Sequence, residues 1–387
     1  MSNRIDVTRL LCDLVAIRSV NPMGHPHAGD TPVEQGVVEY LENLLAPSGL
    51  RTTRLASGEF HQSLLIELPG RDADGGTLFE SHIDTVPGDA WSDRAWSPRV
   101  EGGRVFGLGS CDDKASLTAM VLAMLDLAQS AQRPPQPVYL LAAGDEEHGQ
   151  TGIRRFVADG CAHFERAVFG EPTGLMPVIQ HKGIVRWEIT THGRCAHTSR
   201  PELGSNAILK MLDVVAALQV CEADLQRRYR SELMTGPTLT ISMISGGRFP
   251  NAVPDRCSVF VDLRILPGMD VQEAHRCVVD HLAAMDGQVT HSPLQSDMKP
   301  LSTPPSDPLV RAVEGICRSE LGQAVSPQGV PYGTDAAWLP AGCPAIVLGP
   351  GSIETAHTVD EHVDVAQVES ARRIYRQIML QDWRRGS

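Results

Sequence analysis

Short apolar runs alternate with helical patterns along the first part of this chain. The apolar runs cover residues 62–68, 77–83, 138–143 and 167–170. Helix-period patterns lie between several of them, notably at 32–45 and 114–130. Buried strands that alternate with helices are typical of an α/β layer built on a largely parallel sheet. In such a sheet functional groups gather where strands end, because the loops there converge on one rim.

The middle third of the chain has a different order of elements. Strand patterns occur at 184–192, 238–245, 258–266 and near 288, and helical patterns occur at 205–220 and 271–284. This β-α-β-β-α-β order is that of a ferredoxin-like α+β sandwich. The alternating pattern then resumes, with a core strand at 345–348. Because 387 residues exceed the usual size of one core, we predict a catalytic α/β domain formed by residues 1–182 and 294–387 and interrupted by an inserted domain at 183–293.

Charge and cysteine usage limit the partners and the compartment. A formal net charge of −13 argues against a surface that binds nucleic acid or anionic lipid. Residues 1–20 mix charged with apolar positions, which favours an amphipathic helix over a signal peptide, and no apolar run reaches the roughly 18 residues of a membrane span. The nine cysteines are scattered without a Cys-x-x-Cys pair. We therefore expect neither a disulfide framework nor a cysteine-ligated zinc site, and the cytoplasm fits best.

Histidine and acidic side chains stand at the ends of the apolar runs. His82 and Asp84 close the run at 77–83 and project from one face of an extended chain. A carboxylate beside an imidazole can fix its tautomer and strengthen it as a metal ligand. The alternative is a solvated loop histidine beside a turn-forming aspartate. Asp112 and Asp113 open the next helix, where acids are also ordinary caps.

Three consecutive acids follow the strongly apolar run at 138–143. Asp145, Glu146 and Glu147 would be costly at the end of a buried strand unless a cation neutralised them. A solvated acidic turn is the alternative. The flanking glycines favour close approach of the backbone over loose exposure, so this segment indicates a functional site.

Two further candidates complete the series. Glu171 follows the run at 167–170, and His357 comes after the strand pattern at 345–348. Each is a weak signal alone. Together with the three preceding segments they place imidazole and carboxylate groups at one predicted rim of the sheet, which is the donor set of a metal site.

The combined motifs resemble the M20 metallopeptidase family over about residues 5–370. The resemblance is carried by His82-x-Asp84, Asp112-x-Lys114, Glu146-Glu147, Glu171 and His357. This family includes acetylornithine deacetylases, succinyl-diaminopimelate desuccinylases, aminoacylases, carboxypeptidases and dipeptidases, and it implies a zinc-peptidase-like catalytic domain with an inserted dimerisation or lid domain. The segments 181–183, 333–336 and 349–357 are most similar to the acetylornithine deacetylase branch, although Asp335 stands where that branch frequently has Glu.

The resemblance implies two divalent metal ions, with zinc expected and cobalt or manganese as alternatives. Asp112 would bridge the two ions. His82 and Glu171 would complete one site, and Glu147 and His357 the other. Ions that share a carboxylate lie roughly 3.5–4 Å apart and lower the pKa of a bound water towards neutrality.

Two more residues receive roles from the same resemblance. Glu146 would act as the general base that takes a proton from water and passes it to the departing amine. Asp84 would orient His82. The resemblance also implies a cis peptide bond between Asp112 and Asp113.

The inserted domain offers candidates for substrate binding. The segment 193–201 resembles the family's Gly-x-x-Ala-His motif, which implies that His197 reaches the active site of the other subunit in a homodimer and stabilises the oxyanion. On its own His197 fits an ordinary surface histidine. Asn251 and Arg264 would hold the substrate carboxylate, for which the planar guanidinium is suited. For Arg264 a surface ion pair is the alternative.

These observations lead to three hypotheses of function. The first is a cytoplasmic, homodimeric, two-metal deacylase acting on a small N-acyl amino acid such as N-acetylornithine. The second is a metal-dependent carboxypeptidase or dipeptidase that uses the same site. The third is a metal- or ligand-binding protein without catalysis, and the presence of Glu146 argues against it.

Overall fold

A computed structural model describes residues 5–26, 29, 31–285 and 287–384. The chain forms two compact units. The first comprises Met1–Ile179, Thr303–Gln328 and Thr334–Ser387, and the second comprises Gln180–Ser302 and Gly329–Gly333. Among the described residues no helix is both long and apolar enough to cross a membrane.

The first unit is built on a mixed sheet whose strand order runs β1-β2-β6-β3-β7-β16 and continues with β8 and β14, with β15 on β8; β14 and the ends of β8 and β15 belong to the second unit. Its strands are β1 (Arg51–Ala56), β2 (Gln62–Leu68), β3 (Gly76–His82), β6 (Val138–Ala143), β7 (Phe164–Phe169), β8 (Val178–His181), β14 (Leu301–Ser302), β15 (Gln328–Val330) and β16 (Ala345–Val347). Parallel pairing joins β6, β3, β7 and β16, whereas β1, β2, β8 and β14 pair antiparallel. The four strands that precede the predicted ligands therefore end at one edge.

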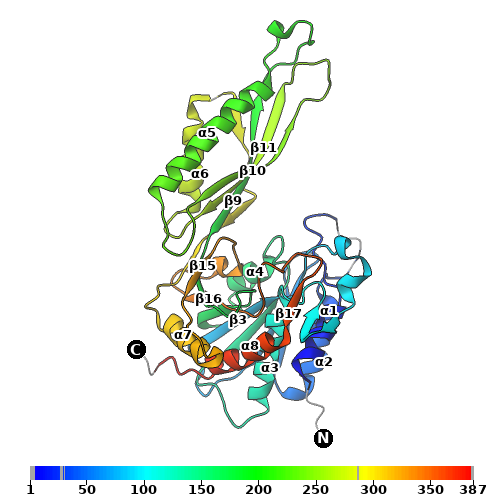
Figure 1. Ribbon diagram of the computed structural model, residues 1–387, viewed down its shortest axis with the longest axis vertical. Helices are drawn as coiled ribbons and strands as arrows, with labels where there is room; N and C mark the ends of the chain where they lie inside the picture. Colours follow the sequence, from blue (N-terminus) through cyan, green and yellow to red (C-terminus); the bar gives the residue numbers. More distant parts are fainter. Residues whose placement is uncertain (1–4, 27–28, 30, 286, 385–387) are drawn as a thin grey trace. The chain divides into compact units, whose positions relative to one another are not determined.

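Helices of the first unit bury apolar faces against this sheet. They are α1 (Val7–Ala16), α2 (Gln35–Leu45), α3 (Lys114–Ala128), α4 (Thr151–Asp159), α7 (Pro308–Leu321) and α8 (Val365–Met379). Helix α3 is apolar on nearly every side and almost wholly buried, so α1 and α8 can pack around it (Figure 1). Tyr375 of α8 meets the edge of Phe79 of β3 and donates a hydrogen bond to the Leu348 carbonyl. The core thus holds the start of α3, which directly follows Asp112 and Asp113.

Short elements absent from the sequence prediction lie between the longer helices and strands of both units. The strands β4 (Arg99–Glu101), β5 (Arg104–Phe106) and β17 (His362–Asp364) form a small antiparallel sheet. The 3₁₀ helices cover Ala46–Ser48, Asp89–Trp96, Pro201–Leu203, Ala283–Met285 and Asp335–Trp338. Pairing of β17 with β5 places the segment after His357 beside the loop that contains Asp112.

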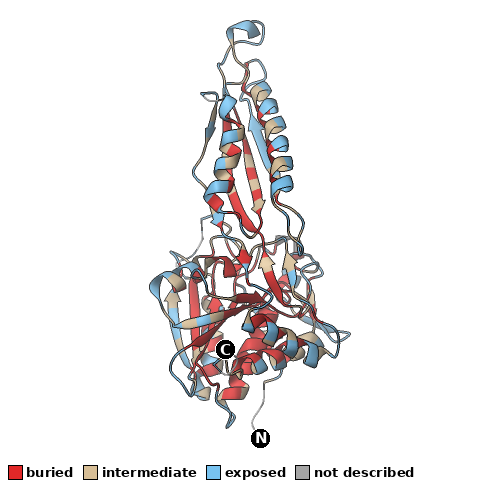
Figure 2. Cartoon of the chain, turned by 90° about the vertical axis from the view of Figure 1, so that its left-hand side faces the viewer, coloured by how far each residue is buried: buried red, intermediate tan, exposed pale blue. Residues whose placement is uncertain are grey.

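The second unit has the predicted β-α-β-β-α-β order. Its elements are β9 (Gly183–His192), α5 (Ala207–Arg228), β10 (Thr238–Gly246), β11 (Arg256–Ile265), α6 (Val271–His281), β12 (Val289–His291) and β13 (Ser296–Met298). The antiparallel sheet has the order β10-β11-β9-β12, with β13 also on β9. Helices α5 and α6 lie side by side on one face of it (Figure 1), and residues of both helices and of the sheet form a buried apolar cluster, shown red in Figure 2.

Candidate metal centre

The carboxyl ends of the parallel strands bring the predicted metal ligands together. His82 is the last residue of β3, and Glu146 and Glu147 follow β6. Glu171 follows β7, and His357 lies in the loop between β16 and β17. We call the group formed by His82, Asp112, Glu146, Glu147, Glu171 and His357 the strand-end cluster. Its position is the rim that the sequence predicts.

Asp112 stands between the two histidines of this cluster. Its Oδ1 lies 2.9 Å from Nε2 of His82, and its Oδ2 lies 3.3 Å from Nε2 of His357. The same His357 nitrogen is 3.3 Å from Oε1 of Glu147. Two sets of ligand atoms lie within 4.8 Å of one another, one from His82, Asp112 and Glu147 and one from His82, Glu146 and Glu171. One carboxylate thus faces two imidazoles, which is the arrangement a bridging ligand needs.

The cluster is closed on one side and open on the other. His82 and Asp112 are buried, with 2% and 7% of each residue exposed. The side chain of His357 is 50% exposed. A small molecule can therefore approach from the His357 side, while the opposite side is shielded from water.

The Asp84 backbone and side chain both fix the cluster. The Nδ1–H of His82 donates to the Asp84 carbonyl oxygen at 3.0 Å, whereas the carboxylate is more distant at 3.7 Å. With Nδ1 occupied, Nε2 of His82, which faces Asp112, is the nitrogen that can bind a metal. The Asp84 carboxylate instead accepts the backbone N–H groups of Glu146 and Glu147 at 3.0 and 3.2 Å. Asp84 therefore positions the acidic turn as well as the imidazole.

Asn21 is a site residue that the sequence interpretation missed. Its Nδ2 donates to Oδ2 of Asp84 at 2.8 Å and to Oδ1 of Asp145 at 2.9 Å, and it is fully buried. Asp145 itself has φ 64° and accepts hydrogen bonds from Gly149 and Thr151. Asn21 thus joins the loop after β3 to the loop after β6. Only its place directly before a proline marked it in the sequence, and that signal does not indicate a binding role.

Glu361 and Lys114 hold the loop that carries Asp112. Oε1 of Glu361 accepts the backbone N–H of Asp112 at 3.1 Å. The buried Lys114 ammonium donates to two carbonyl oxygens at the end of α1, at 2.9 and 3.0 Å, and burial lowers the pKa of this lysine to about 7. The peptide bond between Asp112 and Asp113 is cis, as the family resemblance implied.

The carboxylates of the cluster are poorly neutralised by the protein alone. Burial, and after it the charges of neighbouring acids, raises the pKa of Glu146 and of Glu171 well above the usual range. Burial opposes protonation of His82, but hydrogen bonds to Asp112 and Asp84 raise its pKa well above normal. Hydrogen bonds from His357 and His82 outweigh burial and lower the pKa of Asp112. A bound cation would stabilise the ionised acids in place of these protons.

Two more buried acids lie at the same site. Oε1 of Glu80, on β3, has no hydrogen-bond partner within the described part of the chain. Burial raises the pKa of Asp335 to about 8, and burial followed by the charge of Asp335 raises that of Glu80 well above its usual range. A buried carboxylate oxygen without a hydrogen-bond partner, close to imidazole and carboxylate donors, is expected at a divalent metal site. The residues present therefore fit the metal pair implied by the resemblance.

The remaining predicted residues, His197, Asn251 and Arg264, belong to the second unit. His197 is exposed, and its Nδ1 lies 2.8 Å from Oγ of Ser199. Asn251 is also exposed, and its carbonyl accepts the Thr198 N–H in the same loop pair. Arg264 donates to both carboxylate oxygens of Asp262, at 2.6 and 3.3 Å. This ion pair is the alternative noted from the sequence for Arg264.

A mixed sheet flanked by helices, whose strand ends gather two imidazoles and several buried carboxylates, fits a metal-dependent hydrolase. The model of peptidase family M20/M25/M40 matches residues 78–381, and the chain belongs to this family. An acetylornithine deacetylase of Proteus mirabilis (strain HI4320) is 33% identical over 313 residues, which is 79% of each chain. The protein is accordingly a metal-dependent amidohydrolase or peptidase.

Solved structures share the whole fold at low sequence identity. Aminopeptidase PepT from Bacillus cereus ATCC 10987 superposes with a TM-score of 0.78 at 20% identity over 98% of both chains. An M20 family metallo-carboxypeptidase from Sulfolobus solfataricus gives a TM-score of 0.77 at 17% identity, covering 97% of this chain and 99% of that one. These likenesses establish the architecture, and the substrate is a separate question.

Proposed function

We propose that this protein is a two-metal deacylase that cleaves the amide bond of a small N-acyl amino acid, similar to acetylornithine deacetylase. The observation that carries the proposal is the position of Asp112, whose two oxygens face His82 and His357. The 33% identical acetylornithine deacetylase supports the substrate class. A cytoplasmic location is part of the same proposal.

Five residues would hold the metal ions. Asp112 would be shared, with His82 and Glu171 on one side and Glu147 and His357 on the other. When bound, the two ions would supply Lewis acidity to the attacking water and to the scissile carbonyl. Imidazole and carboxylate donors suit zinc, with cobalt or manganese as alternatives.

Glu146 would move the proton. Its backbone N–H is fixed by Asp84, and its Oε1 accepts a hydrogen bond from Gln150 at 3.1 Å. Its carboxylate lies in one group with His82 and Glu171, within reach of a water placed there. Burial raises its pKa, and a base whose pKa approaches the working pH can both take the proton from water and return it to the leaving amine.

The second unit would complete substrate binding and form the dimer. His197 would stabilise the oxyanion in the other subunit, and Asn251 and Arg264 would hold the substrate carboxylate, which would have to replace Asp262 as the partner of Arg264. Exposed apolar side chains on α5 and β10 support an interface. They include Leu212, Met243 and Ile244, which are 59%, 68% and 63% exposed. Light scattering tests this part, and a monomer at micromolar concentration would contradict it.

The decisive experiment combines a metal count with turnover on a substrate panel. The panel holds N-acetylornithine, N-acetylmethionine, N-succinyl-diaminopimelate and several dipeptides, and wild type is compared with Glu146→Gln. The exposed Glu59→Gln is the matched control. We expect about two catalytic ions per chain, turnover of acyl amino acids, and an inactive Glu146→Gln that keeps its metal. Cleavage of dipeptides alone would favour the peptidase alternative, and activity that survives in Glu146→Gln would contradict the mechanism.

A further inference from the structure

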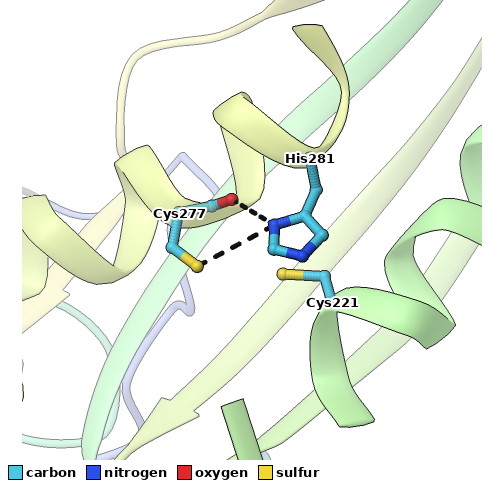
Figure 3. Close-up of side chains that lie close together, drawn as sticks. All are labelled: Cys221, Cys277 and His281. Atoms are coloured by element: carbon cyan, nitrogen blue, oxygen red, sulfur yellow. Dashed lines mark hydrogen bonds between the residues drawn. The ribbon is translucent and has the colours of Figure 1, made fainter. Parts of the chain in front are cut away.

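A second group of metal-binding side chains lies between the two helices of the second unit. Cys221 comes from α5, and Cys277 and His281 come from adjacent turns of α6. Figure 3 shows the two sulfur atoms and the imidazole turned toward one another in the gap between the helices. We call Cys221, Cys277, His281 and the neighbouring Asp224 the α5–α6 cluster. It has no part in the proposed hydrolysis.

The separations in this cluster match those of a metal-binding group. One ligand atom from each of Cys221, Cys277 and His281 lies within 4.8 Å of the others. Sγ of Cys277 is 3.9 Å from Nδ1 of His281. In a tetrahedral zinc site, bond lengths of about 2.0–2.3 Å place the donor atoms roughly 3.3–3.8 Å apart. Small side-chain rotations would therefore suffice to bring the three donors around one ion.

Both nitrogens of His281 are supported by an acceptor. Nδ1 lies 2.8 Å from the Cys277 carbonyl oxygen, and Nε2 lies 3.1 Å from Oδ2 of Asp224. A histidine that binds a metal normally donates its other N–H to a carbonyl or carboxylate. Whichever nitrogen binds here, the opposite one keeps such a partner.

The two thiols are free and differ in exposure. Cys221 is buried and Cys277 half-buried, and neither is in a disulfide. Burial, and then the neighbouring Cys277, raises the pKa of Cys221 to about 12, so the metal-free thiol is neutral. The side chains of His281 and Asp224 are each 21% exposed, which leaves a route for an ion from solvent.

We propose that the α5–α6 cluster is a structural site for a thiophilic divalent cation such as Zn²⁺, with Cys221, Cys277 and His281 as ligands. Two thiolates and an imidazole favour zinc over the hard cations that prefer oxygen. Binding would release the two thiol protons and the proton of the ligating imidazole nitrogen to solvent, and would form two metal–sulfur bonds and one metal–nitrogen bond without any redox change. The ion would tie α5 to α6. Sequence spacing argued against a cysteine-ligated site because the ligands come from separate helices.

Cobalt substitution tests this site separately from the catalytic one. Fully reduced, full-length protein is stripped of metal, loaded with Co²⁺ and measured by absorption spectroscopy. Thiolate ligands produce an intense sulfur-to-cobalt charge-transfer band in the near ultraviolet, which imidazole and carboxylate ligands do not. We expect this band in wild type and in Cys161→Ser, whose half-buried cysteine lies outside the cluster. Cys277→Ser and Cys221→Ser should lose it.

A metal count provides the second readout. After loading with Zn²⁺ and removal of excess ion, Cys277→Ser should hold about one ion per chain fewer than wild type while it still hydrolyses the acyl amino acid. Failure of the proposed catalysis would instead remove turnover and leave the charge-transfer band in place. Folding of each variant is checked by circular dichroism, and His281→Gln offers a partly exposed substitution if Cys221→Ser does not fold. A wild-type protein without the band, or a band unchanged in Cys277→Ser, would overturn the proposal.

Discussion

The strand-end cluster of the first unit and the α5–α6 cluster of the second differ in which part of the fold presents the side chains. In the first, loops after parallel strands supply imidazoles and carboxylates, and several buried acids have carboxylate oxygens without a hydrogen-bond partner in the described part of the chain. In the second, two packed helices supply thiols and one imidazole, each already neutral or hydrogen-bonded. Loop donors can be arranged around a reacting substrate, whereas helix donors are held by the packing that they reinforce. The difference suits catalysis in one unit and stabilisation in the other.

Substitution of the shared carboxylate gives the largest expected effect. Asp112→Asn removes a charge that faces both His82 and His357, so both ions should bind weakly. We expect turnover to fall by about 10³-fold or more, since metal activation and base catalysis are lost together. Metal analysis and initial rates measure this, with the exposed Asp93→Asn as control. The cobalt–sulfur band of the α5–α6 cluster should be unchanged, and its loss would mean that the two clusters are not independent.

The two units should also respond differently to acid, because the second buries a neutral histidine. Burial lowers the pKa of His181 to about 4, and its Nε2 has no partner within the described residues. In the unfolded chain this imidazole takes up a proton below about pH 6.5. The stability that the buried neutral imidazole contributes is therefore complete above that pH and is lost as pH falls towards 4. The free energy of unfolding should fall by roughly 3 kcal/mol when this contribution is lost.

Hydrogen exchange in β8 and β9 measures this effect at pH 7.5 and 5. Wild type should lose protection on acidification by more than His181→Gln does. The exposed His192→Gln should behave as wild type. Equal losses in His181→Gln and wild type would show that His181 does not titrate as its burial requires.

Asn21 tests whether the support of the strand-end cluster extends beyond its ligands. Asn21→Ala removes the hydrogen bonds to Asp84 and Asp145 and leaves every proposed metal ligand in place. Loss of such an outer partner typically reduces metal affinity or activity about 10–100-fold. Half-maximal activity should require a higher Zn²⁺ concentration in Asn21→Ala than in wild type. Asn21→Asp should not restore the wild-type midpoint, because this substitution adds another acid. An unchanged midpoint would limit the role of Asn21 to packing.

The sequence predicts those parts of both units that depend on local pattern. Strands β2 and β6 coincide with the apolar runs at 62–68 and 138–143, because nearly continuous burial leaves a largely apolar stretch. Helix α5 extends to Arg228, past the predicted end at 220, because only Cys221 and Leu225 are buried in residues 221–228 and the polar residues between them weaken the helical pattern. The sheet of β4, β5 and β17 was missed since its strands have three residues each and β17 pairs with β5 from a distant segment.

The site residues divide in the same way, into those that a local sequence pattern marks and those that it does not. His82 and Glu147 were found because each follows a strong strand pattern. Asn21, Glu361 and the α5–α6 cluster were not, because their contacts join segments far apart in the chain and leave no spacing to recognise. Among the described strands of the large sheet, parallel pairing joins β6, β3, β7 and β16. The remaining pairs are antiparallel because pairing depends on neighbours in space, which the local sequence pattern does not set.

Asp224→Asn should have the smallest effect and is the most informative about how the α5–α6 cluster binds its ion. Hydrogen bonds to the Cys277 carbonyl and to Asp224 raise the pKa of His281. In the metal-free protein this variant should therefore lower that pKa, which NMR titration of the imidazole detects. If Asp224 only accepts the ring N–H, the cobalt–sulfur band keeps its shape and the ion binds slightly more weakly. If Asp224 is a fourth ligand, the visible cobalt bands change as water replaces the carboxylate. Since the carboxylate is only 21% exposed and touches Nε2, the first result would assign Nδ1 to the metal, and the second would place Asp224 and Nε2 together on it.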